Sequence, residues 1–495
     1  MHMPRWFCFL FCLVASPAFA ADIIVPAGGN VQPTLDTAKP GDTLLLACGA
    51  VYAPFVVRRP VTIKGDCALP EGTITAAEGL RRPRIVSTDR SQPIIIANGA
   101  RNVSLIGLAV TQTGGQTYQL VSIGAVGVAT VAEFASDILL DRLYLFVADD
   151  MEQRRGVLCN GDGITITRSR IENIKERGAD SQAIGCWNLP GRLTITDNWL
   201  VAAGEVVIIG GGDPSVPGLT PTGILIQNND LTRPIAWRTL IQPWQVKNLL
   251  ELKHARDVKI LNNRMWNNWA AAQDGFAWLF TVQNQDGGCW WCTVEGVLAE
   301  GNRIWNVGQC LQVSGRDAEG QASAVMERVI VRHNVCETWG PPEVGQAVTI
   351  TGTPHRMTFD RNTFLNTCNL LQIAGKVGAG SEGMVWTNTL GRHGDKCWGL
   401  VSSEGGGTAA LNAFWAQGWT FTNNTLANGL AAGSHPVFYP PTTTMPTQAE
   451  FERCFVAYQM PYTVKPDGPC KGQGAVLEPA IDKPATPTLL RLIVD

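Results

Sequence analysis

The amino-acid sequence predicts an all-β protein built as a parallel β-helix, a solenoid whose coils each add short strands to long parallel sheets. Two observations lead to this fold class. A frame of apolar residues around an asparagine recurs along the chain, with no helix-length amphipathic stretch inside the repeat. The 495 residues also include 52 glycines and only 16% charged residues, a composition that favours strands and tight turns over long helices.

The N-terminus predicts a signal peptide over residues 1–20. Arg5 gives a positive start, the apolar run WFCFLFCLVA follows, and Ala18-Phe19-Ala20 forms a small-x-small cleavage pattern. The apolar run is too short to span a membrane, and no later segment is long and apolar enough to do so. We therefore expect export through this signal peptide to a periplasmic or secreted location, without a membrane span.

Cysteine usage agrees with an oxidising compartment. Of the fourteen cysteines, Cys8 and Cys12 lie in the predicted signal peptide, which leaves twelve, an even number that favours disulfides. Cys336 sits in a core position and is predicted to be a free thiol. The predicted pairs are Cys48 with Cys67, Cys159 with Cys186, Cys454 with Cys470, and the CxxC pair Cys289 with Cys292 as a loop staple.

Asn263 defines the repeat, with Val258 five residues before it, Ile260 three before it and Met265 two after it. The period-two alternation makes each unit a strand, and the central positions lie roughly 26 to 40 residues apart, as in a solenoid. Asparagine tolerates the left-handed backbone of a sharp turn, and its amide can bond along a stack, so we expect a structural column rather than a sugar-binding row. The other central residues are Leu143, Ser169, Asn198, Asn229, Asn302, Asn334, Asn362, Asn388 and Asn424.

Residues 23–66, IIVPAGGNVQPTLDTAKPGDTLLLACGAVYAPFVVRRPVTIKGD, resemble the opening of right-handed parallel β-helix proteins of the pectin-lyase-like superfamily. This resemblance implies a right-handed β-helix over residues 21–430, with an N-terminal cap helix at about 31–38. Residues 431–495 would form an irregular C-terminal cap or tail. Members of the superfamily are mostly polysaccharide lyases and glycoside hydrolases, with some non-enzymatic adhesins and structural proteins.

The strand LLELK, residues 249–253, places charge on the outer face, because Leu250 and Leu252 must point inward. Alignment with later coils predicts two outward polar columns. The first contains Glu251, Thr281, Gln312, Thr349 and Gln372, and the second contains Lys253, Gln283, Ser314, Thr351 and Ala374. Two earlier coils add Asp180, Gln182 and Glu205 to the same side.

This face has two interpretations. In one, Glu251 and Lys253 form a surface ion pair on a merely polar sheet. In the other, long loops and flat aromatic rings beside amides form a sugar-binding surface. The second predicts substrate contacts from Asp180, Gln182, Trp187, Gln283 and Gln312. It also draws on the crowded tryptophans Trp237, Trp244, Trp266, Trp269, Trp278, Trp290, Trp291 and Trp305, of which Trp266 and Trp305 are expected to serve coil packing.

The segment ELKHARDVKILNN, with AAQDGFAWLFTVQN in the next coil, resembles the site region of alginate-lyase and chondroitinase-B-like lyases. Those enzymes use a lysine on this strand as base, acidic residues that hold calcium, and an arginine one coil on. Lys253 matches the lysine, and Glu205 and Glu251 are the metal ligands that the resemblance implies for Ca²⁺, without the usual spacing. Gln283 stands at the arginine position and supplies no cation.

The reaction expected from this resemblance is β-elimination on an acidic glycan. A cation neutralises the uronate carboxylate, and a base removes the acidic hydrogen beside it. Lysine acts as a base only where its surroundings favour the neutral amine, whereas Glu251 favours the ammonium. Without a metal, Glu205, Glu251 and Asp180 become the acid and base of a glycoside hydrolase. A non-catalytic glycan-binding or envelope protein is the third alternative. The near-neutral net charge of −3 gives no nucleic-acid footprint, and we expect a monomer.

Overall fold

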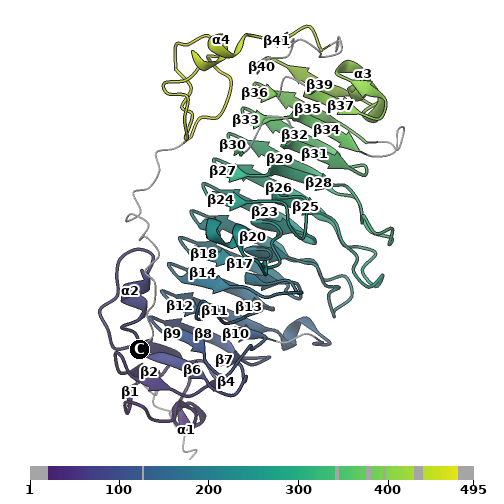
Figure 1. Ribbon diagram of the computed structural model, residues 1–495. Helices are drawn as coiled ribbons and strands as arrows, with labels where there is room; N and C mark the ends of the chain where they lie inside the picture. Colours follow the sequence, from purple (N-terminus) through teal and green to yellow (C-terminus); the bar gives the residue numbers. More distant parts are fainter. Residues whose placement is uncertain are drawn as a thin grey trace, which may run out of the picture.

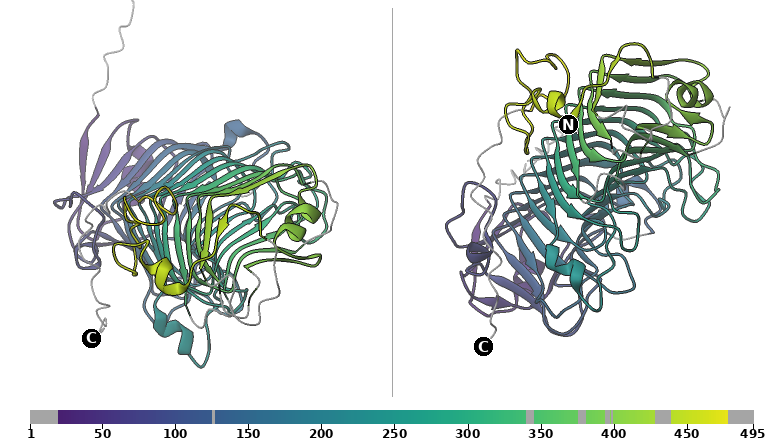
Figure 2. Two further views of the ribbon diagram at one scale, coloured as in Figure 1. Left: turned by 90° about the horizontal axis from the view of Figure 1, so that it is seen from above. Right: turned by 45° about the horizontal axis from the view of Figure 1, so that its top comes forward.

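The computed structural model describes residues 20–124, 127–339, 345–374, 381–393, 397, 399–427 and 439–477. Almost all of the predicted signal peptide lies outside these ranges. The described chain winds into a parallel β-helix, in which three sheets of 14, 13 and 14 strands run along the solenoid (Figure 1). Seen from above, the strands of successive coils lie over one another (Figure 2). The predicted fold class is confirmed.

Sheet A carries the apolar frame that identified the repeat. Its strands pair in parallel, so Ile195, Ile226 and Ile260 stack in register and point into the core. Its strands are β1 (Asp22–Val25), β2 (Thr43–Leu46), β5 (Thr62–Gly65), β8 (Arg101–Ile106), β11 (Ala135–Asp141), β14 (Gly161–Thr167), β17 (Gly191–Thr196), β20 (Thr222–Gln227), β23 (Ala255–Leu261), β26 (Val294–Glu300), β29 (Glu327–Arg332), β32 (His355–Asp360), β35 (Met384–Thr387) and β39 (Trp419–Thr422).

Sheet B follows sheet A within most coils, and the sharp corner between them lies at the asparagine. The inward column of sheet B includes Leu200, Leu231, Met265 and Ile304. Its strands are β3 (Val51–Tyr52), β6 (Arg84–Ser87), β9 (Ala109–Gln112), β12 (Tyr144–Phe146), β15 (Arg170–Ile174), β18 (Trp199–Ala202), β21 (Asp230–Thr232), β24 (Arg264–Asn268), β27 (Arg303–Val307), β30 (Val335–Thr338), β33 (Thr363–Thr367), β36 (Leu390–His393), β40 (Asn424–Ala427) and β41 (Thr443–Thr444).

Sheet C closes each coil, and its outer face carries the predicted functional residues. Only its last pair, β37 and β38, is antiparallel among the pairs described for this sheet. Its strands are β4 (Phe55–Val57), β7 (Ile94–Ile96), β10 (Gln119–Ile123), β13 (Arg155–Cys159), β16 (Gln182–Cys186), β19 (Val207–Ile209), β22 (Leu250–Leu252), β25 (Phe276–Thr281), β28 (Gln309–Ser314), β31 (Gln346–Thr351), β34 (Asn369–Ala374), β37 (Gly399–Ser402) and β38 (Gly405–Gly406).

The asparagine ladder runs along the corner between sheets A and B. The Asn263 Nδ2 donates to Asn302 Oδ1 at 3.0 Å and to the Ile226 carbonyl at 2.9 Å. The same pattern links successive asparagines from Asn198 to Asn362. Each amide is therefore satisfied inside the protein, as predicted for a structural column.

Two details of the predicted ladder are wrong. The left-handed residue is the one before each ladder asparagine, for example Asn262 at φ 55° before Asn263, because the asparagine itself must direct its amide into the stack. Near the C-terminal end, Thr389 occupies the ladder position and bonds to Asn424, while Asn388 is the left-handed residue at φ 53°. In the segment VWTNTL the ladder residue is therefore Thr389, one residue after the predicted Asn388.

The described chain also contains several short helices. Helix α1 (Val31–Thr37) lies at the N-terminal end of the solenoid and is capped by Asn30 (Figure 1). The C-terminal segment 439–477 packs Phe451, Phe455 and Tyr462 against Leu365 and Val335 of sheet B. The remaining helices are α2 (Ala76–Gly79), η1 (Val131–Glu133), η2 (Ile235–Thr239), α3 (Thr408–Phe414) and α4 (Gln448–Glu452).

Six disulfides join the twelve cysteines that follow the predicted signal peptide. The four predicted pairs all form. The prediction of a free thiol at Cys336 is wrong, because a neighbouring strand of sheet C brings Cys310 to it. Cys368 pairs with Cys397, and this pair was not predicted. Among the described helices, none has both the length and the apolar character that crossing a bilayer requires.

Candidate functional site

The outer face of sheet C places Glu251 and Lys253 together, but its register differs from the prediction. Glu251 lies beside Leu279, which in turn pairs with Gln312. Thr281 belongs to the Lys253 column, where it pairs with Ser314. The error is a shift of two residues in β25, since strand alternation fixes the face of a residue but not its position along that face.

Glu251 and Lys253 form a half-buried ion pair. Lys253 Nζ lies 2.9 Å from Glu251 Oε1, although it is not aligned for a hydrogen bond to that oxygen, and it donates to Gln283 Oε1 at 3.2 Å. Asn248 Nδ2 donates to Glu251 Oε2 at 3.1 Å. Glu251 is only 1% exposed, whereas the Lys253 side chain remains 15% exposed. Gln283 reaches Lys253 from the loop after β25, not from a strand.

A second buried carboxylate, Glu205, lies on the same face. Gln182 Nε2 donates to Glu205 Oε2 at 2.8 Å, and Lys247 Nζ lies 3.3 Å from Glu205 Oε1. Lys247 also bonds to Asp180 Oδ2 at 2.6 Å. Burial, followed by the negative charges of Glu251 and Asp180, raises the pKa of Glu205 to about 7. Burial opposes ionisation of Lys247, but the Glu205 and Asp180 carboxylates overcome it and raise the pKa of that ammonium.

The loop between β21 and β22 covers part of this cluster. Its first residue, Arg233, is buried and donates to the carbonyls of Gly204 at 3.1 Å and Asn248 at 2.8 Å. Burial lowers the pKa of Arg233 to about 9. These bonds tie the start of the loop to the turn that carries Glu205 and to the end of the loop, just before the strand of Glu251. Lys247 and Asn248, which sequence reasoning missed, come from the end of this loop.

The predicted tryptophan surface is largely wrong. Trp237, Trp244 and Trp269 are buried in one apolar cluster that holds the loop down, and Trp278 points into the core. Large rings beside a rigid sheet gain more from burial than from display to solvent. Trp266 and Trp305 stack on each other at 4.8 Å, as expected for coil packing. Trp290 is the exposed exception among these, at 69%.

Trp187 and Arg155 form the N-terminal end of the charged surface. The Arg155 guanidinium lies 4.6 Å from the centre of the Trp187 ring. Arg155 pairs in register with Gln182, the residue that donates a hydrogen bond to Glu205, so Arg155 lies one coil before Gln182. Burial, followed by the charge of Arg154, lowers the pKa of Arg155 to about 10. Its Nε and Gln182 Oε1 are buried without a hydrogen-bond partner among the described residues.

His254 follows Lys253 but faces away from the site. Its Nε2 lies 2.9 Å from the Leu219 carbonyl, and its Nδ1 accepts from the Thr293 N–H at 3.1 Å. The Cys289 and Cys292 sulfurs lie near this ring, but they are joined to each other. Because both ring nitrogens are hydrogen-bonded and both sulfurs are in a disulfide, this trio holds two loops together and supplies neither a thiolate nor a free imidazole nitrogen to a metal.

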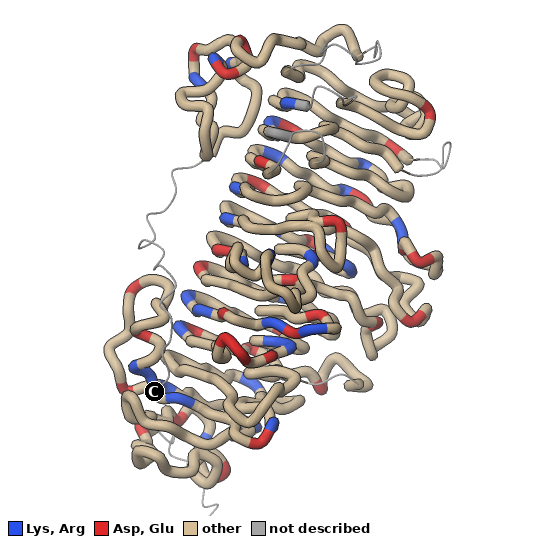
Figure 3. The backbone as a smooth tube through the Cα atoms, viewed as in Figure 1, with Lys and Arg blue, Asp and Glu red and all other residues tan. Residues whose placement is uncertain are grey.

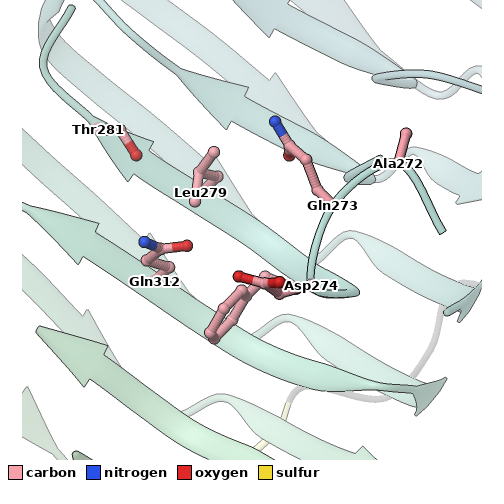
Figure 4. Close-up of a pocket in the computed structure, with 7 residues that line it drawn as sticks. Ala272, Gln273, Asp274, Leu279, Thr281 and Gln312 are labelled. Carbon is pink, nitrogen blue, oxygen red and sulfur yellow. The ribbon is translucent and has the colours of Figure 1, made fainter. Parts of the chain in front are cut away.

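A hollow of about 310 Å³ adjoins the cluster on its C-terminal side. Leu279, Thr281 and Gln312 project into it from the strands, and Gln273 and Asp274 approach from the bordering loop (Figure 4). Gln273 connects the hollow to the charged cluster, because its Oε1 accepts from Asn248 Nδ2 at 2.7 Å. The predicted residues Glu251 and Gln312 thus belong to neighbouring parts of one surface.

The donor set does not fit the calcium ion implied by the resemblance. Glu205 faces Gln182 Nε2 and Lys247 Nζ, and Glu251 faces Asn248 Nδ2 and Lys253 Nζ. Calcium requires six to eight oxygen ligands, whereas here two ammonium groups already balance the two carboxylates. The proposed reaction is therefore not routed through calcium, and chelation tests whether the protein requires the ion.

Charges elsewhere on the solenoid are mixed. Acidic and basic residues occur along its whole length rather than at one end (Figure 3). The feature that distinguishes the site is therefore that its carboxylates are buried. Two carboxylates that are each 1% exposed lie under two partly exposed ammonium groups.

No protein-family model matches the sequence. A search of curated proteins also finds no match. Solved structures do match. An alginate lyase from Paenibacillus sp. str. FPU-7 is 13% identical, with a TM-score of 0.28 over 72% of this chain and 94% of that one. The catalytic unit of a GH87 α-1,3-glucanase from Streptomyces thermodiastaticus strain HF3-3 is 13% identical, with a TM-score of 0.46 over 88% and 68%.

A third match is the PL6 family alginate lyase AlyGC, at 12% identity and a TM-score of 0.45, over 93% of this chain and 57% of that one. These identities and TM-scores are low. The function proposed below therefore rests on the geometry of the site itself.

Proposed function

We propose that the protein cleaves an acidic polysaccharide by β-elimination at the charged surface of sheet C. One observation carries this proposal. The Lys247 and Lys253 ammonium groups are partly exposed, while the carboxylates that balance them, Glu205 and Glu251, are buried beneath. A uronate approaching the face therefore meets the ammonium groups before it meets Glu205 and Glu251, and it competes for Lys247 with Asp180, whose side chain is 38% exposed.

The cations have distinct roles in this proposal. Lys247 neutralises the carboxylate of the reacting uronate, which acidifies the hydrogen on the neighbouring carbon. Arg155 lies three strands before Glu251 in sheet C and would pair with a different uronate, nearer the N-terminal end of the face. Lys253 removes that hydrogen as a proton. The C–O bond to the next sugar then breaks, its electrons leave on the sugar oxygen, and a C=C bond forms. The sugar oxygen takes a proton from water, and the hydroxide that remains takes the proton held by Glu251, which restores the ion pair.

Lys253 must lose its own proton before it can act as the base. Its ion-pair partner Glu251 is the acceptor, 2.9 Å away and 1% exposed. Glu251 Oε1 is the oxygen that can take this proton, because it is buried without a hydrogen-bond partner among the described residues. Glu251 would then store the lysine proton during the reaction.

A glycoside hydrolase is the second candidate, and the raised pKa of Glu205 favours it. A carboxyl group with a pKa of about 7 is suited to the role of general acid, and a second carboxylate, Glu251, lies on the neighbouring strand. In the free protein, however, Lys247 and Gln182 cover both oxygens of Glu205. Hydrolysis would require the ligand to displace one of them.

The test incubates the purified protein with a panel of acidic and neutral polysaccharides. Reducing ends and the ultraviolet absorbance of unsaturated uronates are measured in parallel. We expect both signals to rise together on an acidic glycan. Reducing ends without unsaturation would reject the lyase and support the hydrolase, and binding without either product would support a non-catalytic glycan-binding protein.

A further inference from the structure

We infer that the substrate is a mixed acidic polysaccharide, in which uronate units are separated by uncharged sugars. This inference rests on the proposed function and specifies its substrate. It comes from the part of the sheet C face that follows Lys253 along the solenoid, which we call the neutral half. Its outward positions are Phe276, Leu279, Thr281, Gln309, Gln312, Ser314, Gln346, Thr349, Thr351, Asn369, Gln372 and Ala374.

The neutral half continues the columns of the charged cluster in register. Leu279, Gln312, Thr349 and Gln372 extend the column of Glu251. None of the outward strand positions of the neutral half carries a charge. Adjacent coils are about 4.8 Å apart, so a glycan lying along the solenoid contacts charged side chains at one end and uncharged side chains a few coils further on.

The neutral half is equipped to bind hydroxyl groups. Within the described chain, Thr281 Oγ1, Gln346 Oε1 and Thr349 Oγ1 are buried without a hydrogen-bond partner. Buried polar atoms are normally satisfied, so these atoms mark places where a ligand or water bonds. The hollow adds an apolar floor from Phe276 and Leu279. Apolar floor and neutral polar rim suit an uncharged sugar, whose faces are apolar and whose edges carry hydroxyls.

A homopolyuronate is a poor match for the same surface. It carries a carboxylate on every unit, and the units over the neutral half would have no cation within the outward strand positions. Asp274, exposed at the rim of the hollow, would repel them. Arg316 follows the end of β28, but its guanidinium is directed to Thr353 and to the Ser323 carbonyl. A desolvated carboxylate without a partner is disfavoured.

The experiment measures dissociation constants for three oligosaccharides of equal length: a homopolyuronate, an alternating uronate and neutral-sugar oligomer, and a neutral oligomer. The Lys253→Arg variant serves as the host, to preserve the glycans during the measurement. We expect the alternating oligomer to bind at least tenfold more tightly than either of the others. In Gln312→Lys, on the same background, the homopolyuronate should gain at least threefold relative to the alternating oligomer.

Ile330→Lys is the matched control, because it adds the same charge to an exposed position of sheet A. It should leave the binding ratio unchanged. Equal or tighter binding of the homopolyuronate, or an unchanged ratio in Gln312→Lys, would overturn the inference. If all three oligomers fail to bind, both the inference and the proposed function fall. If wild-type protein cleaves acidic glycans but prefers the homopolyuronate, only the inference falls.

Discussion

Polar residues form columns both at the corner between sheets A and B and on the outer face of sheet C. The two regions differ in whether the polar atoms of these columns have hydrogen-bond partners. At the corner, each asparagine from Asn198 to Asn334 donates to the next asparagine and to a backbone carbonyl. On the face, Arg155 Nε, Gln182 Oε1 and Thr281 Oγ1 are buried without partners among the described residues. Repetition alone therefore does not distinguish a structural column from a functional one, whereas hydrogen-bond satisfaction does.

The charges sharpen this comparison. The ladder is built from neutral amides, and its bonds keep the coils in register. The face concentrates Glu205, Lys247, Glu251 and Lys253 within neighbouring coils at the cost of burying two carboxylates. Buried ion pairs contribute little net stability, so their presence favours a functional explanation. Substitutions in the two regions should therefore have separable effects.

The largest effect is expected for Lys253→Arg. Arginine preserves the positive charge beside Glu251, so the melting temperature should change little, but a guanidinium does not give up its proton at neutral pH. General base catalysis contributes about 10²–10⁴-fold, so kcat/KM should fall at least about a hundredfold. Lys253→Ala should lose activity and stability together, because it leaves a buried carboxylate unpaired. Full activity in Lys253→Arg would show that Lys253 is not the catalytic base and only balances the charge of Glu251.

Asn263→Leu should show the opposite pattern. Each buried polar group left without a partner costs about 1–3 kcal/mol, and the Asn263 amide serves Asn229, Asn302 and Ile226, so we expect a loss of about 3 kcal/mol or more. Urea unfolding measures this loss, and kcat/KM of the folded fraction should stay unchanged. Wild-type stability in this variant would show that the ladder is dispensable.

The pH dependence of stability tests Glu205. Its pKa is raised to about 7 in the folded protein, so the folded state binds a proton that the unfolded state releases near pH 4.5. The protonated Glu205 therefore stabilises the folded state fully below about pH 4.5. This contribution to the free energy of unfolding, up to about 3 kcal/mol, is lost as the pH rises through about 7. Glu205→Gln should lack this component. Parallel stability curves for wild type and variant between pH 4.5 and 8 would contradict the assignment.

The smallest effect is expected from metal removal. Because protein donors already face the Glu205 and Glu251 oxygens, a chelator such as EDTA should leave both the melting temperature and kcat/KM unchanged. Dialysed protein without chelator provides the control. A loss of activity that calcium restores would show that the ion displaces Lys247 or Lys253 from these carboxylates.

The sequence could predict the fold because period-two alternation and the asparagine frame are local signals. The same signals place Glu251 and Lys253 on one face. They could not place Thr281, since a shift of two residues preserves alternation, and they could not separate Asn388 from Thr389, since both are turn residues. Sequence periodicity also gave no indication of Lys247 or Asn248, which reach the face from a loop outside the repeat. Their only signal was polarity at the end of the tryptophan-rich segment.

The most direct test of the central proposal is a crystal structure of Lys253→Arg with a bound acidic oligosaccharide. We predict that the glycan lies along the outer face of sheet C, with a uronate carboxylate at Lys247 and an uncharged unit in the hollow lined by Leu279 and Gln312. A glycan bound only to the outer faces of sheets A or B, with the ion pairs of Glu205 and Glu251 undisturbed, would contradict the proposed site.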